Sequence, residues 1–276
     1  MKALVALELN RLAVEDVELA PPQAGEVRVR MKAAGVCHSD LSVVNGTVPM
    51  PLPMVLGHEG AGIVETVGPG VTRVAAGDHV VLSFVPNCGE CWFCVRQEPH
   101  LCVRCDAGGR MWDGTSRLKL RGQELGAMSQ LGCLAQYAVV PAASVMPIDR
   151  TIPFDCAALV GCAVMTGVGA VTNTAQVEAG STVAVFGCGG VGLAAIQGAR
   201  LVGAKQIIAV DLADNKLEYA RRFGATHCVK ASDGVVAEVQ ALTQGLGVDH
   251  SFEMTGRPAV MEQAYAAARR GGSVCI

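Results

Sequence analysis

The 276-residue sequence has little net charge and no concentration of charge. Its 22 lysines and arginines nearly balance 25 aspartates and glutamates, which leaves a formal net charge of −3. No run of like charges, basic stripe, internal repeat or low-complexity tract occurs. The sequence therefore shows no electrostatic signature of a nucleic-acid or anionic-membrane partner. Hydrophobic residues make up 51% of the chain, enough for buried cores, and the length allows two domains.

The pattern of a secretion signal is also lacking. Lys2 and Glu8 interrupt the N-terminal stretch, and no small-residue cleavage site follows an apolar run. We therefore expect a cytoplasmic protein. Two charge-free runs, Cys156–Val177 and Ala179–Ala199, are long enough to cross a membrane. Both are rich in glycine, alanine and threonine, and the interior of an α/β domain explains them better, so no membrane partner is expected.

Twelve cysteines are many for such a chain. Without a secretion signal, we expect metal ligands and small buried residues rather than disulfides. Cys88, Cys91, Cys94 and Cys102 have the spacing C-x2-C-x2-C-x7-C. Four such thiolates can close a tetrahedral shell around one zinc ion with no open position, which predicts a structural zinc. The alternatives are an iron–sulfur cluster, which usually has a shorter last spacing, and disulfides. Cys105, close by, stays unassigned.

The first 150 residues are predicted to form a β domain. In Glu26–Lys32, apolar residues alternate with charged ones, which is the pattern of a half-buried strand. Similar short runs, separated by glycine and proline, follow at residues 62–67, 79–84 and 135–140. This spacing favours a compact, barrel-like domain.

From about Thr151 the pattern changes to short apolar runs separated by helical segments. The runs lie at residues 182–186, 206–210, 227–229, 249–254 and 273–276. Strands that alternate with helices form a parallel sheet with right-handed crossovers, so the second half is predicted to be a doubly wound α/β domain. Because such a sheet has six strands and residues 273–276 form its fifth, we expect the fold to be incomplete at the C-terminus.

A glycine-rich turn follows the first strand of this second half. The residues Gly187, Gly189, Gly190, Val191 and Gly192 belong to a G-x-G-x-x-G sequence between a predicted strand and a predicted helix. This context indicates a dinucleotide site in which the helix N-terminus faces the pyrophosphate. Asp211 follows the second strand, where a carboxylate binds the adenosine ribose and disfavours a 2′-phosphate, so NAD is favoured over NADP. The alternative is a glycine-rich turn with a solvated aspartate.

A second set of metal-binding residue types is scattered along the first half. It comprises Cys37-His38-Ser39-Asp40, Gly57-His58-Glu59-Gly60 and Gly161-Cys162. Each segment alone is compatible with a packed cysteine or a core histidine. Together, two thiolates and an imidazole offer a three-ligand zinc site with one position open for substrate.

With these residues in view, the chain resembles the zinc-containing medium-chain alcohol dehydrogenases, in the branch with animal and glutathione-linked enzymes. The four-cysteine segment, Gly-His-Glu at 57–59, Gly-Asp-His-Val at 77–80 and Asp-Gly-Thr-Ser-Arg at 113–117 occur in family order. The resemblance implies a GroES-like β-barrel catalytic domain at residues 1–150, with a zinc lobe at about 87–106, and an NAD-binding Rossmann domain at 151–276. It also implies a homodimer or homotetramer for full-length members.

The resemblance also implies roles for individual residues. The catalytic zinc is held by Cys37, His58 and Cys162, with Glu59 behind it and Asp40 orienting His58. The other roles are proton acceptance by Ser39, cofactor contacts by His38, Thr166 and Lys216, and a wall of the alcohol pocket at Phe84. Two departures are evident. Ser42 stands where many relatives have a proton-relay histidine, and relatives continue beyond the position of Ile276.

The implied reaction is the reversible, NAD-linked oxidation of an alcohol, expected to be primary, to an aldehyde by hydride transfer. S-(hydroxymethyl)glutathione is an alternative substrate. Polyol dehydrogenases usually carry a carboxylate where Cys162 stands, and zinc-free quinone reductases lack these ligands. A zinc- and nucleotide-binding remnant without activity is the non-enzymatic alternative.

Overall fold

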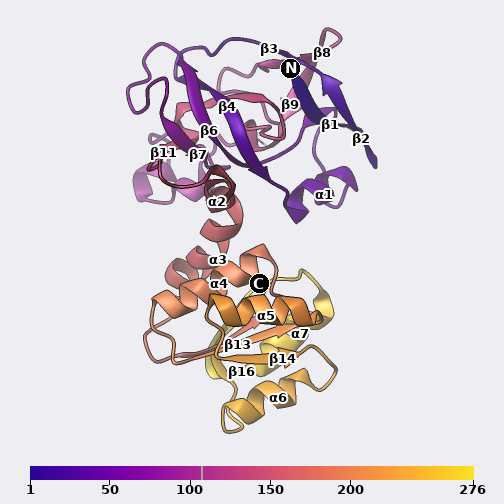
Figure 1. Cartoon of the computed structure of the whole chain (residues 1–276), viewed down its shortest axis with the longest axis vertical. Coiled ribbons are helices and arrows are strands. Elements are labelled where there is room, and N and C mark those ends of the chain that lie inside the picture. Colours follow the sequence, from indigo (N-terminus) through magenta and orange to yellow (C-terminus); the bar gives the residue numbers. More distant parts are fainter. Residues whose placement is uncertain (107) are drawn as a thin grey trace. The chain divides into compact units, whose positions relative to one another are not determined.

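The computed structural model describes residues 1–106 and 108–276. The chain divides into two compact units, unit 1 (Met1–Cys162) and unit 2 (Ala163–Ile276) (Figure 1). The change of sequence pattern at about Thr151 therefore precedes the end of unit 1, because the helical segment that follows it still supplies Cys162 to that unit.

Unit 1 is built from two antiparallel-rich sheets. The first has the order β2-β1-β5-β9-β8-β3, formed by β1 (Lys2–Glu8), β2 (Arg11–Asp16), β3 (Glu18–Leu19), β5 (Met54–Val55), β8 (Leu118–Leu120) and β9 (Gln123–Ala127). The second has the order β10-β4-β6-β7-β11, formed by β4 (Glu26–Gly35), β6 (Glu59–Val67), β7 (His79–Leu82), β10 (Tyr137–Pro141) and β11 (Val145–Pro147). A β domain is what the first half of the sequence predicts.

The central strand pair of unit 1 is β4 with β6, which run antiparallel from Val27 opposite Val67 to Gly35 opposite Glu59. Val27 and Val29 are fully buried in the core between the strands and their covering segments, as the alternation in β4 predicts. Helix α1 (His38–Val44) begins just beyond the end of β4. The end of this pair therefore carries two chain segments that contain candidate metal ligands.

The zinc-lobe segment contains only short helical turns, η1 (Cys94–Arg96) and η2 (Pro99–Leu101). Two further 3-10 turns lie elsewhere among the described residues of unit 1, η3 (Met128–Gln130) and η4 (Ala142–Ser144). Because the lobe has so little regular structure, four side chains directed at one point are the natural means of ordering it.

One continuous helical stretch, Phe154–Thr174, is long and apolar enough to cross a membrane by length and composition. It consists of α2 (Phe154–Leu159), η5 (Val160–Val164), α3 (Met165–Gly169) and η6 (Ala170–Thr174). Ala157 and Ala158 pack with Ala61 in unit 1, and Val171 is fully buried in the core of unit 2. Parts of the helix thus contribute to the core of each unit, although only 39% of its most apolar window is buried.

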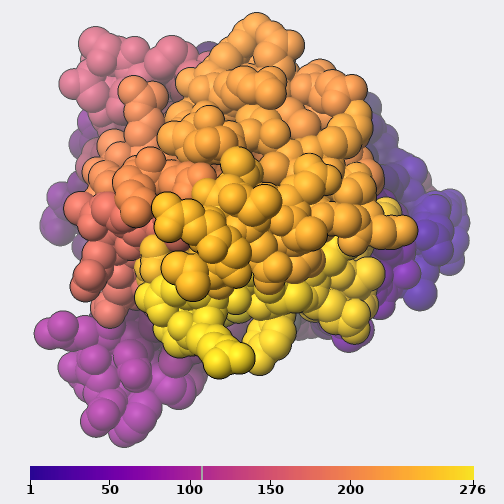
Figure 2. Space-filling view, turned by 90° about the horizontal axis from the view of Figure 1, so that it is seen from below, coloured from indigo at the N-terminus to yellow at the C-terminus, as the bar shows by residue number. Residues whose placement is uncertain are grey.

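Unit 2 is a parallel five-stranded sheet with the order β14-β13-β12-β15-β16. Its strands are β12 (Thr182–Phe186), β13 (Gln206–Asp211), β14 (His227–Lys230), β15 (Val248–Glu253) and β16 (Ala268–Cys275), and its helices are α4 (Gly190–Leu201), α5 (Asp214–Phe223), α6 (Val235–Leu242) and α7 (Pro258–Ala267). The chain order 3-2-1-4-5 is that of the doubly wound nucleotide-binding fold. The last strand starts earlier than the predicted 273–276, and the C-terminal residues, in yellow, reach the surface of unit 2 (Figure 2).

The half-buried carboxylate of Asp249 joins three segments near the N-terminal ends of strands in unit 2. Asp249 accepts hydrogen bonds from the backbone N–H and the hydroxyl of Thr182 at 2.7 and 2.8 Å. The guanidinium of Arg269 donates to its other oxygen at 2.6 Å. Burial opposes ionisation, but these hydrogen bonds prevail and lower the pKa of Asp249 from 3.8 to about 2.

The charge of Asp249 is therefore predicted to stabilise the fold in mild acid. A carboxyl with a depressed folded-state pKa contributes stability above its unfolded pKa, and that stability is lost as the pH falls from about 4 to about 2. Asp249→Asn should flatten this part of the pH dependence of the urea midpoint. Asp233→Asn, at an exposed aspartate of the same unit, is the matched control and should keep the native slope. An unchanged slope in Asp249→Asn would contradict the prediction.

Candidate metal centres and nucleotide-binding site

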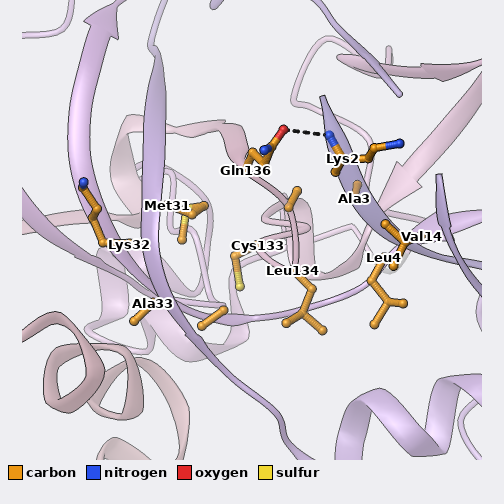
Figure 3. A pocket seen from close by; sticks show the side chains of 12 residues that line it. Lys2, Ala3, Leu4, Val14, Met31, Lys32, Ala33, Cys133, Leu134 and Gln136 are labelled. Atoms are coloured by element: carbon orange, nitrogen blue, oxygen red, sulfur yellow. Dashed lines mark hydrogen bonds between the residues drawn. The ribbon is translucent and has the colours of Figure 1, made fainter. Parts of the chain in front are cut away.

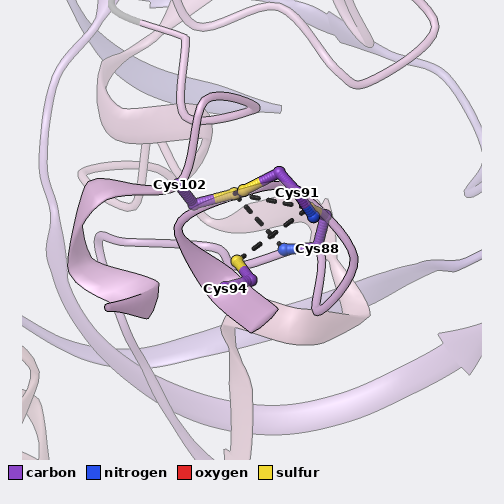
Figure 4. A group of neighbouring side chains, drawn as sticks. All are labelled: Cys88, Cys91, Cys94 and Cys102. Carbon is purple, nitrogen blue, oxygen red and sulfur yellow. Dashed lines mark hydrogen bonds between the residues drawn. The ribbon is translucent and has the colours of Figure 1, made fainter. Parts of the chain in front are cut away.

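The four cysteines of the lobe converge on one point (Figure 4). Sγ of Cys88 lies 3.6 Å from Sγ of Cys102 and 4.0 Å from Sγ of Cys94, and Cys91 lies 4.0 Å from Cys102. A tetrahedral zinc at about 2.3 Å from each sulfur places neighbouring sulfurs about 3.8 Å apart. The cage therefore fits one zinc ion, whereas a cluster of several iron atoms needs more widely separated thiolates.

Backbone N–H groups donate hydrogen bonds to these sulfurs and favour the thiolate form that binds a cation. The N–H of Cys91 donates to Sγ of Cys88 at 3.3 Å, and the N–H of Cys88 donates to Sγ of Cys102 at 3.4 Å. Hydrogen bonds from the backbone at Cys94 and Val103 lower the pKa of Cys91 to about 6. All twelve cysteines are free thiols, so the disulfide alternative has no support in the structure.

The scattered set of the first half also converges. Ligand atoms of Cys37, His58, Glu59 and Cys162 all lie within 4.8 Å of one another, and all four residues belong to unit 1. Cys37 caps the N-terminus of α1, His58 and Glu59 stand at the start of β6, and Cys162 lies in η5. Three segments remote in sequence thus bring two thiols, an imidazole and a carboxylate to one buried point.

Asp40 connects two of these segments. One oxygen of its carboxylate accepts the backbone N–H of Cys37 at 2.9 Å, and the other accepts the backbone N–H of Gly57 at 3.0 Å. The second oxygen also lies 3.6 Å from Nδ1 of His58, a buried nitrogen. This carboxylate therefore faces the ring nitrogen that a metal bound at the opposite nitrogen leaves free, which is the arrangement of a histidine metal ligand and its supporting carboxylate.

The electrostatics of the set favour a cation. Hydrogen bonding from Cys162 and His58 lowers the pKa of Cys37 to about 3. Burial opposes protonation of His58, but the neighbouring carboxylate of Asp40 and the thiolate of Cys37 raise its pKa to about 9. The hydrogen bond to the Cys37 thiolate, together with burial, raises the pKa of Cys162. A divalent metal bound here would replace the protons that His58 and Cys162 hold and would compensate the buried negative charge.

The remaining predicted residues of unit 1 surround this set. The ring of Phe84 lies edge-on to that of His58, with centroids 5.9 Å apart. Oγ of Ser39 lies 3.6 Å from Sγ of Cys37. His38 is exposed, and its Nδ1 lies 3.4 Å from Oγ of the buried Ser42. Ser42, the residue that departs from the family pattern, thus contacts a histidine one turn earlier on α1.

One cavity of unit 1 is lined by none of the predicted site residues (Figure 3). Its volume is about 430 Å³, and its walls are mostly apolar, with Met31, Cys133 and Leu134 among them. At its edge the backbone N–H of Lys2 donates to Oε1 of Gln136 at 2.9 Å. The candidate metal site is therefore identified by its converging ligand atoms and not by the volume of a cavity.

The glycine-rich turn of unit 2 has the close approaches that a nucleotide turn requires. Gly187 has a φ of +95°. A Cβ on Gly192 would lie 1.8 Å from the carbonyl oxygen of Gly187, so a side chain is excluded there. A Cβ on Gly189 would meet nothing within 4 Å. The turn is thus closely packed at Gly192 and open at Gly189, where a phosphate can approach the first N–H groups of α4.

Asp211 stands at the end of β13 and contacts this turn. Its carboxylate accepts the backbone N–H of Cys188 at 2.7 Å and that of Ala213 at 2.9 Å. Lys216 lies on the exposed face of α5, and Thr166 is exposed on α3. A Cβ on Gly167, the residue after Thr166, would lie 2.3 Å from the carbonyl oxygen of Val191, so α3 packs closely on the start of α4.

A cavity of about 280 Å³ opens beside Asp211 at the carboxyl ends of the strands. Ligands of doubly wound sheets bind at this edge. Sequence reasoning did not single out several residues of its lining, namely Leu212, Ser232, Asp233, Thr255, Arg257, Val260 and Gln263. The signal that was available is their position, because Leu212, Ser232 and Thr255 follow the ends of predicted strands.

Comparison with known proteins identifies the family. Residues 23–150 match the alcohol dehydrogenase GroES-like domain, and residues 190–276 match the zinc-binding dehydrogenase domain. The whole chain is 45% identical to alcohol dehydrogenase class-3 of Myxine glutinosa and covers 75% of that protein. The chain belongs to the zinc-dependent medium-chain alcohol dehydrogenases.

Solved structures of related alcohol dehydrogenases have the same fold. An alcohol dehydrogenase zinc-binding domain protein from Burkholderia ambifaria superposes with a TM-score of 0.92 at 38% identity, over 99% of this chain and 75% of that one. Benzyl alcohol dehydrogenase from Acinetobacter calcoaceticus superposes with a TM-score of 0.91 at 34% identity, with the same coverage. The predicted GroES-like and Rossmann-type fold, the zinc-dependent family and its alcohol oxidoreduction are confirmed.

The four-cysteine cage of this alcohol dehydrogenase is predicted to carry a zinc of its own. Cys91→Ser should lower the zinc content from about two ions per chain to about one and lower the melting temperature, because a structural site contributes directly to folding. Cys105→Ser, at the neighbouring thiol outside the cage, is the matched control and should keep about two. Zinc is counted by atomic emission after gel filtration. Equal zinc loss in both variants would refute the assignment.

Proposed function

We propose that this alcohol dehydrogenase is NAD-linked and oxidises a primary alcohol to an aldehyde at a zinc held by Cys37, His58 and Cys162. The observation that carries the proposal is the convergence of two thiols and one imidazole within 4.8 Å of one another. Three protein ligands of this kind leave one coordination position for a substrate, in contrast to the closed cage of four cysteines.

The zinc, when bound, supplies Lewis acidity, which lowers the pKa of a hydroxyl from about 16 to about 7. The side chains of the site act around that effect. Asp40 orients the ring of His58 through Nδ1 and aligns the segment of Cys37 through its backbone N–H. Glu59 adds a buried carboxylate behind the ligands. Phe84, edge-on to His58, offers an apolar wall for the carbon chain of the alcohol.

Ser39 is proposed to take the proton of the substrate hydroxyl into a hydrogen bond. Its Oγ lies beside Sγ of Cys37, and the side chain is exposed rather than buried in the core. Ser42 stands where many relatives carry a histidine, but it contacts His38, which is exposed to solvent. This contact supports His38 as the residue near the proton exit as well as a contact of the cofactor phosphates.

NAD, when bound, accepts the hydride. The chain's part is to position it: the open face of Gly189 and the first turn of α4 receive the pyrophosphate. The carboxylate of Asp211 borders the cavity at the strand ends, where it accepts hydrogen bonds from ribose hydroxyls and repels a 2′-phosphate. Thr166 and Lys216 are proposed as further cofactor contacts, at the nicotinamide and at the adenosine ribose.

Removal of one ligand of the proposed catalytic zinc should abolish turnover and leave the cage intact. In His58→Ala and in Cys162→Ala, alcohol-dependent NADH formation should fall to background, and zinc content should fall from about two ions per chain to about one. The matched control is Cys156→Ala, at an exposed cysteine of the neighbouring helix α2, which should keep activity and both ions. Full activity in either ligand variant would exclude the assignment.

Cofactor preference should depend on the charge of Asp211. In Asp211→Asn the side chain keeps an oxygen for the backbone N–H groups of Cys188 and Ala213 but loses its charge. The ratio of kcat/KM with NAD to kcat/KM with NADP should fall by about tenfold, as expected from roughly 1.4 kcal/mol of lost discrimination. Asp211→Gly should lower the same ratio and also weaken NAD binding, because the turn loses its acceptor. A native ratio in both variants would count against the role.

S-(hydroxymethyl)glutathione is the second candidate substrate. The relative at 45% identity is named alcohol dehydrogenase class-3, whereas a solved structure at 34% identity is named benzyl alcohol dehydrogenase. Steady-state rates with aliphatic alcohols, benzyl alcohol and formaldehyde plus glutathione separate these substrates. The homodimer or homotetramer and the cytoplasmic location implied by the family stay predictions.

A further inference from the structure

Gly35, the last residue of β4, lies directly opposite Glu59, the first residue of β6. A Cβ on Gly35 would lie 2.0 Å from Oε2 of Glu59, 3.0 Å from its Cδ and 3.1 Å from its Cβ. Gly35 does not have a positive φ, so its backbone conformation is open to any residue. The need for glycine at this position is therefore steric, and the atoms that require it belong to the Glu59 side chain.

The Glu59 carboxylate occupies the space that Gly35 leaves. It is buried, and one of its oxygens lies within 4.8 Å of the ligand atoms of Cys37, His58 and Cys162. Burial and the nearby Cys37 thiolate raise the pKa of Glu59, while a hydrogen bond with Cys162 opposes the rise. The carboxylate is thus confined between the end of β4 on one side and the candidate zinc ligands on the other.

The two strands cannot separate to relieve an overlap at this point. Farther along the same pair, a Cβ on Gly62 would lie 2.3 Å from the carbonyl oxygen of Arg30. A Cβ on Gly60 would lie 2.6 Å from Cε of Met31 and 2.9 Å from Cβ of the buried Cys133. Strand β6 is therefore packed closely against its neighbours over its first residues, so an added methyl at Gly35 has to displace the Glu59 side chain.

We propose that Gly35 is a positioning residue for the catalytic zinc site: by lacking a side chain, it allows the Glu59 carboxylate to lie beside the zinc ligands. This inference rests on the proposed function, because it takes Cys37, His58 and Cys162 as the ligands. Gly35 touches no ligand atom itself and acts through Glu59. A methyl group at position 35 displaces the carboxylate and so weakens the hold on the metal, as loss of a residue that supports metal ligands does.

The test is the rate at which the zinc-loaded protein releases its two ions to a chelating dye. Gly35→Ala should release the catalytic ion about 10- to 100-fold faster, the range typical for loss of a supporting group. Release from the four-cysteine cage should stay at the native rate. The absorption band of cobalt placed in the catalytic site should shift in the same variant, because the negative charge beside the ligands has moved.

A double-variant cycle separates positioning from general damage. Glu59→Ala should accelerate release by a similar factor, and Gly35→Ala in the Glu59→Ala background should add little, because Oε2 and Cδ are no longer present. Gly169→Ala, at a helical glycine where a Cβ would meet nothing within 4 Å, is the control and should leave catalytic-zinc release native. A native release rate in Gly35→Ala, or multiplicative effects in the double variant, would overturn the inference.

Two further outcomes are informative. If Gly35→Ala fails to fold, adding Glu59→Ala should restore folding, and failure of that rescue would also overturn the inference. If the native protein releases only the ion of the four-cysteine cage, then the ligand assignment itself is wrong. The proposed function and the role of Gly35 thus fail by different observations.

Discussion

The structure depends on one buried carboxylate that joins two chain segments at the metal site. Asp40 accepts the backbone N–H of Cys37 with one oxygen and that of Gly57 with the other, so a single side chain aligns the residues before α1 with those before β6. A buried carboxylate is costly unless hydrogen-bonded or paired, and here two backbone N–H groups satisfy it, while Nδ1 of His58 lies 3.6 Å away. The contacts that stabilise this charge also hold Cys37 and His58, two candidate metal ligands, near one point. The stability of unit 1 and the geometry of the candidate metal site therefore depend on the same carboxylate.

Close backbone approach is the second constraint, and it recurs in both units. At Gly35 the strand end leaves room for the Glu59 carboxylate, and at Gly192 the helix start approaches the carbonyl of Gly187. Neither position needs glycine for a left-handed backbone, because only Gly187 in this group has a positive φ. In both places the absence of a side chain allows a close approach, of the Glu59 carboxylate to Gly35 and of the Gly187 carbonyl to Gly192, that any other residue would obstruct. Glycine here acts on packing rather than on flexibility.

Features formed within one short segment were predicted from the sequence more directly than features formed by distant segments. The cage of Cys88, Cys91, Cys94 and Cys102 and the turn at Gly187 lie within short segments, so their spacing alone was enough to predict their chemistry. Cys37, His58 and Cys162 are far apart, so residue type suggested a three-ligand zinc site and the family resemblance assigned it, because ordinary spacing rules do not say which strand ends meet. The positions of Arg257 and Ser232 in the cavity lining of unit 2, and of Gly35 beside Glu59, depend on how the chain folds and were not predictable from residue type.

The two candidate metal sites also differ in the groups that shift the pKa values of their side chains. In the cage, backbone N–H groups lower the pKa of Cys91 to about 6, so the thiolate is stabilised by the local chain and the shell closes around its ion. At the second site, hydrogen bonding from Cys162 and His58 lowers the pKa of Cys37 to about 3, while Asp40 and Cys37 raise the pKa of His58 to about 9 against the effect of burial. A metal bound there would replace protons and compensate buried negative charge. Four thiols can close a tetrahedral shell, whereas two thiols and one imidazole would leave one position open, so the number of ligands would separate a structural ion from one that a substrate can reach.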